Sequence, residues 1–190
     1  VRALGQRALV VHADVADEAQ VLAMYASVDK EFGALGGLVN NAGVVDLPSR
    51  VDEMSSQRLM RMFAINLTGS FLCAREAVKR MSSKHGGAGG VIVNLSSAAA
   101  RLGSPGQYVD YAAAKAGLIN LGADLCVDLA ARGIRINAIA PGYFETEMNR
   151  DWLKSPGGEK LRSRVPAGRF GQPQDLDGAL LFLASDASVF

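Results

Sequence analysis

Short apolar segments alternate with long helical segments along this chain, and the alternation limits the folds it can adopt. The pattern predicts strands at 8–13, 37–40, 91–95 and 134–140. It predicts helices at 17–32, 55–84 and 108–131, and a last helix that starts after Pro173 and ends near Ala184. Asp17 is the expected N-cap of the first helix and Gly33 its C-terminal stop. Such alternation favours an α/β, Rossmann-like, doubly wound parallel sheet in three layers.

The composition fits one ordinary globular domain, so we expect residues 1–190 to form a single unit. The chain has 190 residues, 20 basic and 19 acidic side chains and a net charge of +1. This balance gives no basic footprint for nucleic acid or for an anionic membrane surface. No apolar stretch approaches the ~18 residues of a membrane span, and no signal peptide is recognisable. We therefore expect a cytoplasmic protein without nucleic-acid or membrane partners.

The cysteines and histidines do not follow a metal-binding pattern. Cys73 and Cys126 fall inside predicted helices and form no CxxC motif. Buried free thiols are the expected state, with a disulfide or a metal site as alternatives. His12 and His85 lie far apart in the sequence, so neither is expected to be a ligand. We expect no metal site.

The notable polar and glycine clusters follow the predicted strands at their carboxyl ends. They are Asp14, the run Asn40-Asn41-Ala42-Gly43, the pair Ser96-Ser97 and the pair Pro141-Gly142. Ligands of open parallel sheets bind outside the carboxyl ends of the strands. The sequence therefore predicts a ligand site at this one edge.

Tyr111 and Lys115 lie four residues apart on a predicted helix, so their side chains rise from the same face. A phenol ordinarily titrates near ~10, and a cation close to it favours the phenolate form. The pair can therefore make tyrosine an acid or a base near neutral pH. The alternative is a chance pair on a solvated helix, with Lys115 extended from the apolar face to the solvent.

Asn66 and Ser97 are two further candidates. Asn66 lies in the middle of an apolar stripe, so its amide should be buried and needs partners. Those partners can be purely structural or functional. Ser97 could hold a carbonyl oxygen beside Tyr111, or be an ordinary loop serine. A serine hydrolase is excluded because the GxSxG elbow is absent.

Together these segments resemble the short-chain dehydrogenases/reductases of the classical branch. The ordered motifs are Asp14-Val15, NNAG at 40–43, INLTG around Asn66, NLSS at 94–97, YAAAK at 111–115 and PGYFETEM at 141–148. The segment RVPAGRFGQPQDL at 164–176 resembles the closing part of the same family. Within the family the chain looks most like bacterial glucose-dehydrogenase-like or 3-oxoacyl-carrier-protein-reductase-like members.

The resemblance implies an oxidoreductase that uses NAD or NADP and moves a hydride to or from a secondary alcohol or ketone. Tyr111 would be the general acid/base, and Lys115 would lower its pKa and hold the nicotinamide ribose. Ser97 would orient the substrate oxygen, and Asn66 would hold a water that links Lys115 to the solvent. No metal or covalent nucleophile is needed for this chemistry.

The resemblance also implies where the cofactor would bind. The residues are Asp14 and Val15 at the adenine, Asn40, Ala42 and Gly43 at the adenosine ribose, Tyr111 and Lys115 at the nicotinamide ribose, and Pro141, Gly142, Phe144 and Thr146 at the nicotinamide end. The segment 143–166 would form the substrate lid. The helices around Asn66 and Tyr111 would form a homodimer or homotetramer interface.

The family begins with a strand, a glycine-rich TGxxxGxG turn and a second strand, and none of these is found before Val1. In the family order 3-2-1-4-5-6-7 the two missing strands would separate the strand at 8–13 from that at 37–40 by roughly 14 Å. The family's last strand is not found either. We therefore expect a fragment of a longer enzyme or the product of a truncated gene.

Two function classes remain open at this point: the oxidoreductase, and a truncated non-catalytic fragment or interaction module without the phosphate loop. A nucleotide-sugar epimerase of the extended branch is a weaker rival. The sequence does not specify the substrate or the preference between NAD and NADP.

Overall fold

The computed structural model describes residues 1–147 and 149–189, so Met148 of the PGYFETEM motif lies outside the described residues. Its sheet has three parallel strands in the order β1-β2-β3. They are β1 (Gly37–Asn40), β2 (Gly90–Leu95) and β3 (Ile134–Ile139). Asn40 pairs with Asn94, and Asn94 with Ala138, so the carboxyl ends of all three strands lie at one edge. The predicted α/β class is confirmed.

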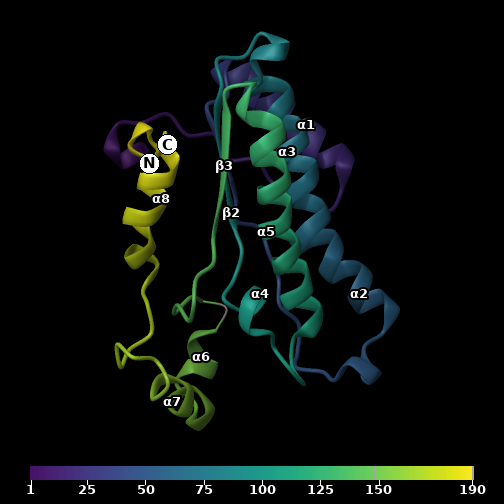
Figure 1. Ribbon diagram of the computed structural model, residues 1–190, viewed down its shortest axis with the longest axis vertical. Coiled ribbons are helices and arrows are strands. Elements are labelled where there is room, and N and C mark those ends of the chain that lie inside the picture. The colour runs from purple at the N-terminus through teal and green to yellow at the C-terminus, as the bar shows by residue number, and fades with distance from the viewer. Residues whose placement is uncertain (148, 190) are drawn as a thin grey trace.

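The helices cover both faces of this sheet. They are α1 (Glu18–Phe32), α2 (Ser56–Phe63), α3 (Gly69–Met81), α4 (Ala99–Leu102), α5 (Val109–Ala130), α6 (Arg150–Leu153), α7 (Pro156–Arg162) and α8 (Asp177–Ala184). Figure 1 shows α3 and α5 along one face and α8 on the other. The three-layer arrangement predicted from the strand and helix pattern is therefore confirmed.

The ends of α1 follow the sequence signals. Asp17 is the N-cap, and its side chain accepts hydrogen bonds from the backbone N–H groups of Ala19 and Gln20. Gly33 ends the helix with φ of 75°, a conformation that glycine adopts without a steric penalty. Both expectations for this helix are confirmed.

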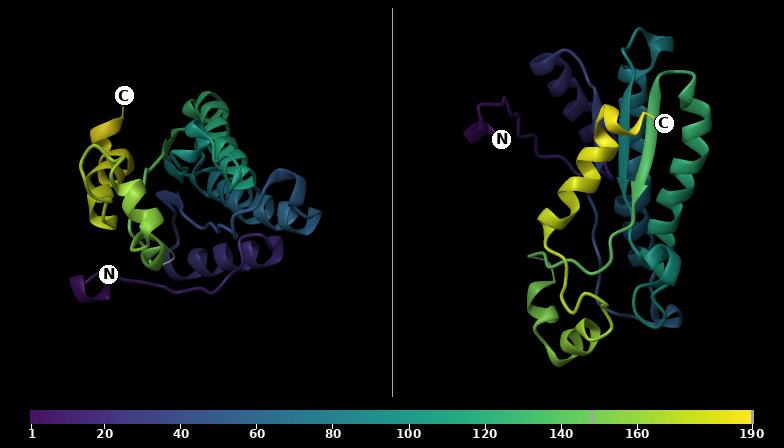
Figure 2. Two further views of the ribbon diagram at one scale, coloured as in Figure 1. Left: turned by 90° about the horizontal axis from the view of Figure 1, so that it is seen from below. Right: turned by 60° about the vertical axis from the view of Figure 1, so that its left-hand side comes forward.

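The strand predicted at 8–13 is wrong. The segment is not paired with any strand in the described part of the chain, and Figure 2 shows the N-terminal segment running away from the sheet. A strand is defined by hydrogen bonds to a neighbour, because an apolar run alone does not satisfy its backbone groups. The segment therefore has the apolar composition of a strand, but among the described residues it has no neighbouring strand to pair with.

The core lies between the sheet and the helices α1, α3 and α5. Its buried members are Val21, Tyr25, Cys73, Ala74, Ala77, Met81, Ile92, Leu129, Ile134 and Ile136. The Tyr25 hydroxyl donates a 2.8 Å hydrogen bond to the Cys73 carbonyl, so this polar group is satisfied inside the core. Cys73 is a buried free thiol, as expected. Cys126 is also free but exposed, in a hollow that it lines together with residues of β2 and β3, so its predicted burial is wrong.

The helix predicted over 55–84 is present from Ser56 to Met81 and contains one π turn in its middle. A π-helical turn, η3 (Ala64–Thr68), joins α2 to α3 and has Asn66 at its centre. Single π turns of this kind occur often at functional sites. The periodicity of the sequence continues through this turn, so the sequence predicted the helix but not the π geometry within it.

The turn before β2 provides a test of backbone fit. Gly89 has φ of +88°, and a Cβ there would lie 2.5 Å from the Gly133 carbonyl oxygen, whereas a Cβ at Gly86, with φ of +85°, would meet nothing within 4 Å. We expect Gly89→Ala to lower the free energy of unfolding by about 1–2 kcal/mol more than Gly86→Ala does. Urea unfolding of the two variants measures this difference, and equal losses would contradict the structure of the turn.

Candidate active site

The functional side chains predicted from the sequence meet at the carboxyl edge of the sheet. The turn after β1, the end of β2 and the first turns of α5 lie side by side there, since Lys115 of α5 reaches the last residue of β2. The Lys115 Nζ donates a 2.7 Å hydrogen bond to the Leu95 carbonyl, and the Ser96 hydroxyl donates one of 2.7 Å to the Lys115 carbonyl. The start of α5 is thereby fixed against the end of β2.

Tyr111 and Lys115 share one face of α5, as their spacing predicted. The Lys115 Nζ lies 5.7 Å from the centre of the Tyr111 ring. Lys115 is 4 % exposed, so the alternative in which it extends into the solvent is wrong. An ammonium group this deeply buried is costly unless it is paired, and the hydrogen bond to Leu95 partly compensates it.

The pKa values of the two groups move in the directions that burial dictates. Burial lowers the pKa of Lys115 to about 8. Burial raises the pKa of Tyr111, and a hydrogen bond with the Ser97 side chain acts in the opposite direction. The lowering of the Tyr111 pKa by Lys115 that the resemblance implied is therefore not found. The reason is that removal of the phenol from water outweighs the stabilisation of its charged form.

Asn66 of the π turn is fully buried and bridges to the loop after β1. Its Oδ1 accepts a 3.1 Å hydrogen bond from the Val44 N–H, and its Nδ2 donates to the Val44 carbonyl at 2.9 Å. Nδ2 also donates to the Met62 carbonyl at 3.1 Å. The predicted burial of Asn66 is confirmed, and its side chain acts as a structural bridge.

Gly43 lies where Asn66 and Lys115 converge. A Cβ on Gly43 would be 2.8 Å from Asn66 Oδ1 and 3.3 Å from Lys115 Nζ. Any larger residue would therefore push these two polar groups apart. The absence of a side chain at Gly43 therefore allows Asn66 and Lys115 to approach the backbone of this turn.

Asn40 and Asn94, at the ends of β1 and β2, form a buried polar pair. The Asn40 Nδ2 donates to Asn94 Oδ1 at 2.9 Å and to the Ser70 carbonyl at 3.3 Å. The Asn94 Nδ2 is buried without a hydrogen-bond partner among the described residues. The pair connects the strand ends to the start of α3.

Asp14 and Val15 lie beside that same start of α3. A Cβ on Gly69, the first residue of α3, would be 2.7 Å from Val15 Cγ2, so the two segments are in close contact. Asp14 is exposed, and its Oδ1 accepts a 2.9 Å hydrogen bond from the Ala16 N–H. Ala42 is exposed in the turn after β1. These three residues border the edge from the side of α1.

The segment after β3 borders the edge from the other side. The Pro141 carbonyl accepts a 2.8 Å hydrogen bond from the Ala98 N–H, which places Pro141 and the exposed Gly142 next to the serine loop. Phe144 forms a parallel bridge with Gly171. The Thr146 N–H donates to Asn149 Oδ1 at 2.8 Å, and Asn149 Nδ2 donates to the Phe144 carbonyl at 2.8 Å. Asn149 thus folds this segment into a tight turn.

The residues at this edge fit the nicotinamide half of a dinucleotide. The buried Lys115 ammonium and the Tyr111 phenol supply a cation and a hydroxyl group next to each other at this edge. In the part of the chain that the structure describes, no group of three or more His, Cys, Asp or Glu side chains is arranged to hold a metal ion. Within the same residues, none of the helices combines the length and apolar character of a membrane span.

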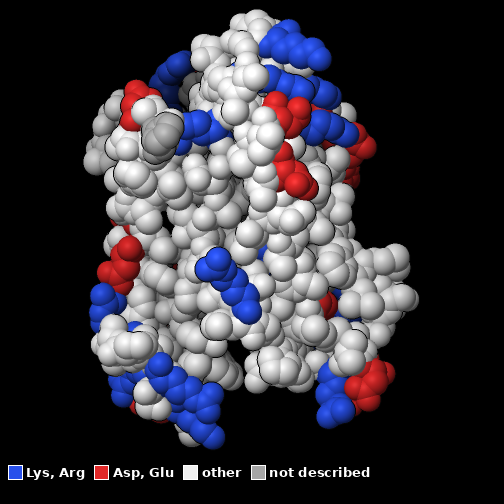
Figure 3. All heavy atoms as spheres, in the orientation of Figure 1, with Lys and Arg blue, Asp and Glu red and all other residues white. Residues whose placement is uncertain are grey.

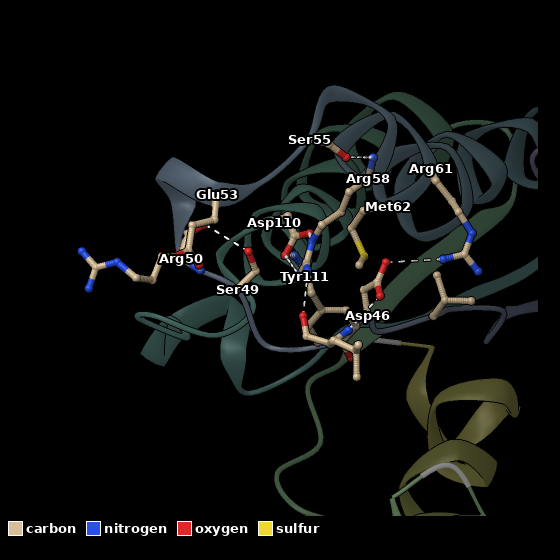
Figure 4. Close-up of polar contacts among 12 residues, drawn as sticks. Asp46, Ser49, Arg50, Glu53, Ser55, Arg58, Arg61, Met62, Asp110 and Tyr111 are labelled. Carbon is tan, nitrogen blue, oxygen red and sulfur yellow. Dashed lines mark hydrogen bonds and ion pairs between the residues drawn. The ribbon is translucent and has the colours of Figure 1, made fainter.

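Sequence reasoning missed one buried ion pair beside Tyr111. Arg58 of α2 donates from Nε to Asp110 Oδ2 at 2.8 Å, and Asp110 immediately precedes Tyr111. Figure 4 shows the Arg58 side chain extending from α2 toward Asp110 and Tyr111. The only local signal was an acidic residue in the first turn of a predicted helix, which is common.

Comparisons with known proteins identify relatives over the whole chain. The family model described as enoyl-(acyl carrier protein) reductase matches residues 1–190. The chain is 44% identical over 186 residues to YgfF, an uncharacterized oxidoreductase of Escherichia coli (strain K12), covering 98% of this chain and 75% of that protein. It is 37% identical over 190 residues to the 3-oxoacyl-[acyl-carrier-protein] reductase FabG of Staphylococcus aureus (strain N315), covering 100% and 75%.

A solved structure gives the same result. The gluconate 5-dehydrogenase of Burkholderia cenocepacia J2315, in complex with NADP and tartrate, superimposes with a TM-score of 0.90 at 37% identity. The match covers 98% of this chain and 72% of that one. The resemblance predicted from the motifs is therefore confirmed.

Proposed function

This chain belongs to the short-chain dehydrogenase/reductase family of NAD(P)-dependent oxidoreductases, and we propose that it interconverts a secondary alcohol and its ketone with Tyr111 as general acid/base. The observation that carries the proposal is the position of the Tyr111 phenol, beside Ser97 and Lys115 at the carboxyl edge of the sheet. Ser97 supplies a hydrogen-bond partner and Lys115 a cation beside this phenol, so we propose that Tyr111 exchanges a proton with the substrate oxygen.

Each residue has a defined task in this reaction. When bound, the nicotinamide supplies the hydride that reaches the carbonyl carbon. Tyr111 donates its proton to the carbonyl oxygen, and Ser97 holds that oxygen in place. Lys115 holds the nicotinamide ribose, and Asn66 holds a water that links Lys115 to the solvent. In the reverse direction the Tyr111 phenolate accepts the alcohol proton.

The cofactor-binding residues follow from the same proposal. They are Asp14 and Val15 for the adenine, Asn40, Ala42 and Gly43 for the adenosine ribose, and Pro141, Gly142, Phe144 and Thr146 for the nicotinamide end, with Tyr111 and Lys115 at its ribose. Their support is their common position along the carboxyl edge, between the start of α3 and the turn closed by Asn149. We propose that residues 1–190 act as one domain.

The segment 143–166 is the proposed substrate lid. It contains α6 and α7, which follow the turn at Phe144. Figure 3 shows Lys and Arg side chains gathered over these two helices at the lower left of the view. Lys154 and Lys160 are among the exposed cations there. This charge is a reason to include carboxylated ketones among the test substrates.

A substrate screen tests the proposal. The protein is assayed with NADH and NADPH against ketones, keto sugars, keto acids and acyl thioesters, and the loss of reduced nicotinamide is followed. We expect turnover with at least one ketone and one of the two cofactors. Binding of neither cofactor, together with no turnover, would favour the non-catalytic alternative instead.

We also propose that the chain forms a homodimer or homotetramer through the helices around Asn66 and Tyr111. A groove of about 350 Å³ runs between these helices, lined by Leu67, Phe71, Gly117, Asn120, Leu121, Asp124 and Leu125. Phe71 is 48% exposed on this surface, which suits burial against a second copy.

Mutation of Phe71 tests this interface. We expect Phe71→Glu to convert the oligomer to monomer, because a buried carboxylate would oppose the apolar contact. Leu181→Glu is the matched control, since Leu181 is 68% exposed on α8, on the other face of the sheet from α3 and α5 (Figure 1). Size-exclusion chromatography with light scattering measures the masses. A parent protein that is only monomeric would contradict the interface.

The cytoplasmic location stays a prediction of the sequence.

A further inference from the structure

Arg58 connects three separate segments of the chain beside the candidate site. Its Nε donates to Asp110 Oδ2 at 2.8 Å, and one terminal nitrogen donates to Asp110 Oδ1 at 3.4 Å. The other terminal nitrogen donates to the Leu47 carbonyl at 2.6 Å. One guanidinium therefore joins α2, the loop after β1 and the first turn of α5.

The Asp110 carboxylate likewise makes several hydrogen bonds. The Asp110 side chain is fully buried, and its Oδ1 also accepts a 2.9 Å hydrogen bond from the backbone N–H of Tyr111. Burial would raise the pKa of Asp110, but the hydrogen bonds from Arg58 and from the Tyr111 N–H hold it below its usual value. The pair is therefore ionised, and Asp110 contacts the backbone of the proposed acid/base residue itself.

The loop after β1 is held at both ends. Asn66 holds Val44 through two hydrogen bonds, and Arg58 holds Leu47. The Ser49 N–H donates to the Gln107 carbonyl at 2.9 Å, just before α5 begins. The loop that carries Gly43 and the helix turn that carries Tyr111 are thus fixed to each other through Arg58.

A buried ion pair is an inefficient way to stabilise a fold, because removal of two charges from water offsets most of their attraction. The geometry of the pair is more specific than its contribution to stability. Arginine presents a planar fork that can bind a carboxylate with two donors and a carbonyl with a third, which lysine cannot do. The arrangement therefore suits a role in orientation.

We propose that Arg58 and Asp110 are positioning residues that fix the Tyr111 phenol relative to the loop at Gly43. The proposal rests on the proposed function, since positioning affects turnover only if Tyr111 transfers the proton. Arg58 acts through Asp110 and Leu47, and among the described residues it makes no hydrogen bond to the phenol itself. We call the contacts of Arg58 with Asp110 and Leu47 the clamp. Small displacements of reacting groups lower the reaction rate strongly, so loss of the clamp should lower mainly kcat.

The decisive variant is Arg58→Met/Asp110→Asn in the intact protein. It leaves no unpaired buried charge, the new amide oxygen can still accept from the Tyr111 N–H, and methionine replaces the apolar stem of Arg58. We expect thermal stability near that of the parent, a kcat about 10-fold or more lower, and a KM for the nicotinamide cofactor within about twofold. We expect faster amide hydrogen exchange at both 44–50 and 108–112.

The matched control is Arg61→Met/Asp46→Asn. This ion pair joins the same helix to the same loop, with a separation of 3.8 Å, but both of its side chains are exposed and it does not include α5. We expect no change in kcat or in exchange at 108–112. If the decisive variant does not fold, Arg58→Lys is used instead, because lysine keeps the charge without the planar fork. Its kcat and its amide hydrogen exchange then test the proposal.

The outcomes separate the two proposals. A clamp variant with kcat within about twofold of the parent and unchanged exchange would overturn the positioning role. A parent without turnover would count against the proposed function, while faster exchange at both segments would still support the mechanical link. An equal loss of kcat in the control variant would also overturn the proposal, because the effect would then not depend on the contact of Arg58 with α5.

Discussion

Replacement of Tyr111 by phenylalanine is expected to lower kcat by roughly 10²–10⁴-fold, the range associated with loss of a general acid or base. The substitution removes only the hydroxyl, so the ring keeps its place 5.7 Å from the Lys115 ammonium. Cofactor affinity should change by no more than about twofold, because the proposed contacts of Lys115 and Gly43 remain. Steady-state kinetics and fluorescence titration with reduced nicotinamide measure the two effects.

Tyr108 provides the matched control for this variant. It is the N-cap residue of α5, three positions before Tyr111, and burial raises the pKa of its phenol as well. Tyr108→Phe should keep kcat within about twofold, since we assign this phenol no proton transfer. More than about a tenth of the parental rate in Tyr111→Phe would be incompatible with the acid/base role.

The parts of the fold that depend on residues close together in the sequence could be predicted. The cap at Asp17, the stop at Gly33 and the alternation of strands and helices are local signals, and the structure follows them. The strand at 8–13 was wrong and the π turn at Asn66 was not predicted, because both depend on distant partners. A strand needs a neighbour, and the π turn accompanies the Asn66 bridge to Val44.

The candidate site shows the same division. The shared face of Tyr111 and Lys115 and the burial of Asn66 follow from helical periodicity. The pair of Arg58 and Asp110 does not, because its members are 52 residues apart and no spacing rule connects them. The direction of the Tyr111 pKa was also beyond local reasoning, since a nearby cation can be read from spacing but the depth of burial cannot.

Lys115→Met is expected to remove nearly all turnover and yet to stabilise the fold. The buried amine has a pKa of about 8, lowered by burial from its ordinary value of 10.5. Below pH 8 the folded protein therefore carries a charge that would be better solvated in the unfolded chain. At ~1.36 kcal/mol per unit this costs on the order of 3 kcal/mol, of which loss of the hydrogen bond to Leu95 offsets about 1 kcal/mol in the variant.

The sign of the pH dependence follows from proton binding. Between pH 8 and 10.5 the unfolded parent binds more protons than the folded parent, so the contribution of Lys115 to stability rises with pH in this window. The advantage of Lys115→Met should be about 2 kcal/mol at pH 7, should reach zero near pH 10 and should change sign above it, where only the lost hydrogen bond remains. Urea unfolding at pH 7 and pH 10 measures the change.

Lys30→Met is the control for this measurement, because Lys30 is exposed in the last turn of α1 and its ammonium stays in water. Its effect on stability should be small at both pH values. A variant at 115 that is less stable than the parent at pH 7 would show that the ammonium contributes to the fold. The stabilisation expected instead means that the chain keeps a costly buried cation beside Tyr111, which is the pattern of a residue retained for chemistry at the expense of stability.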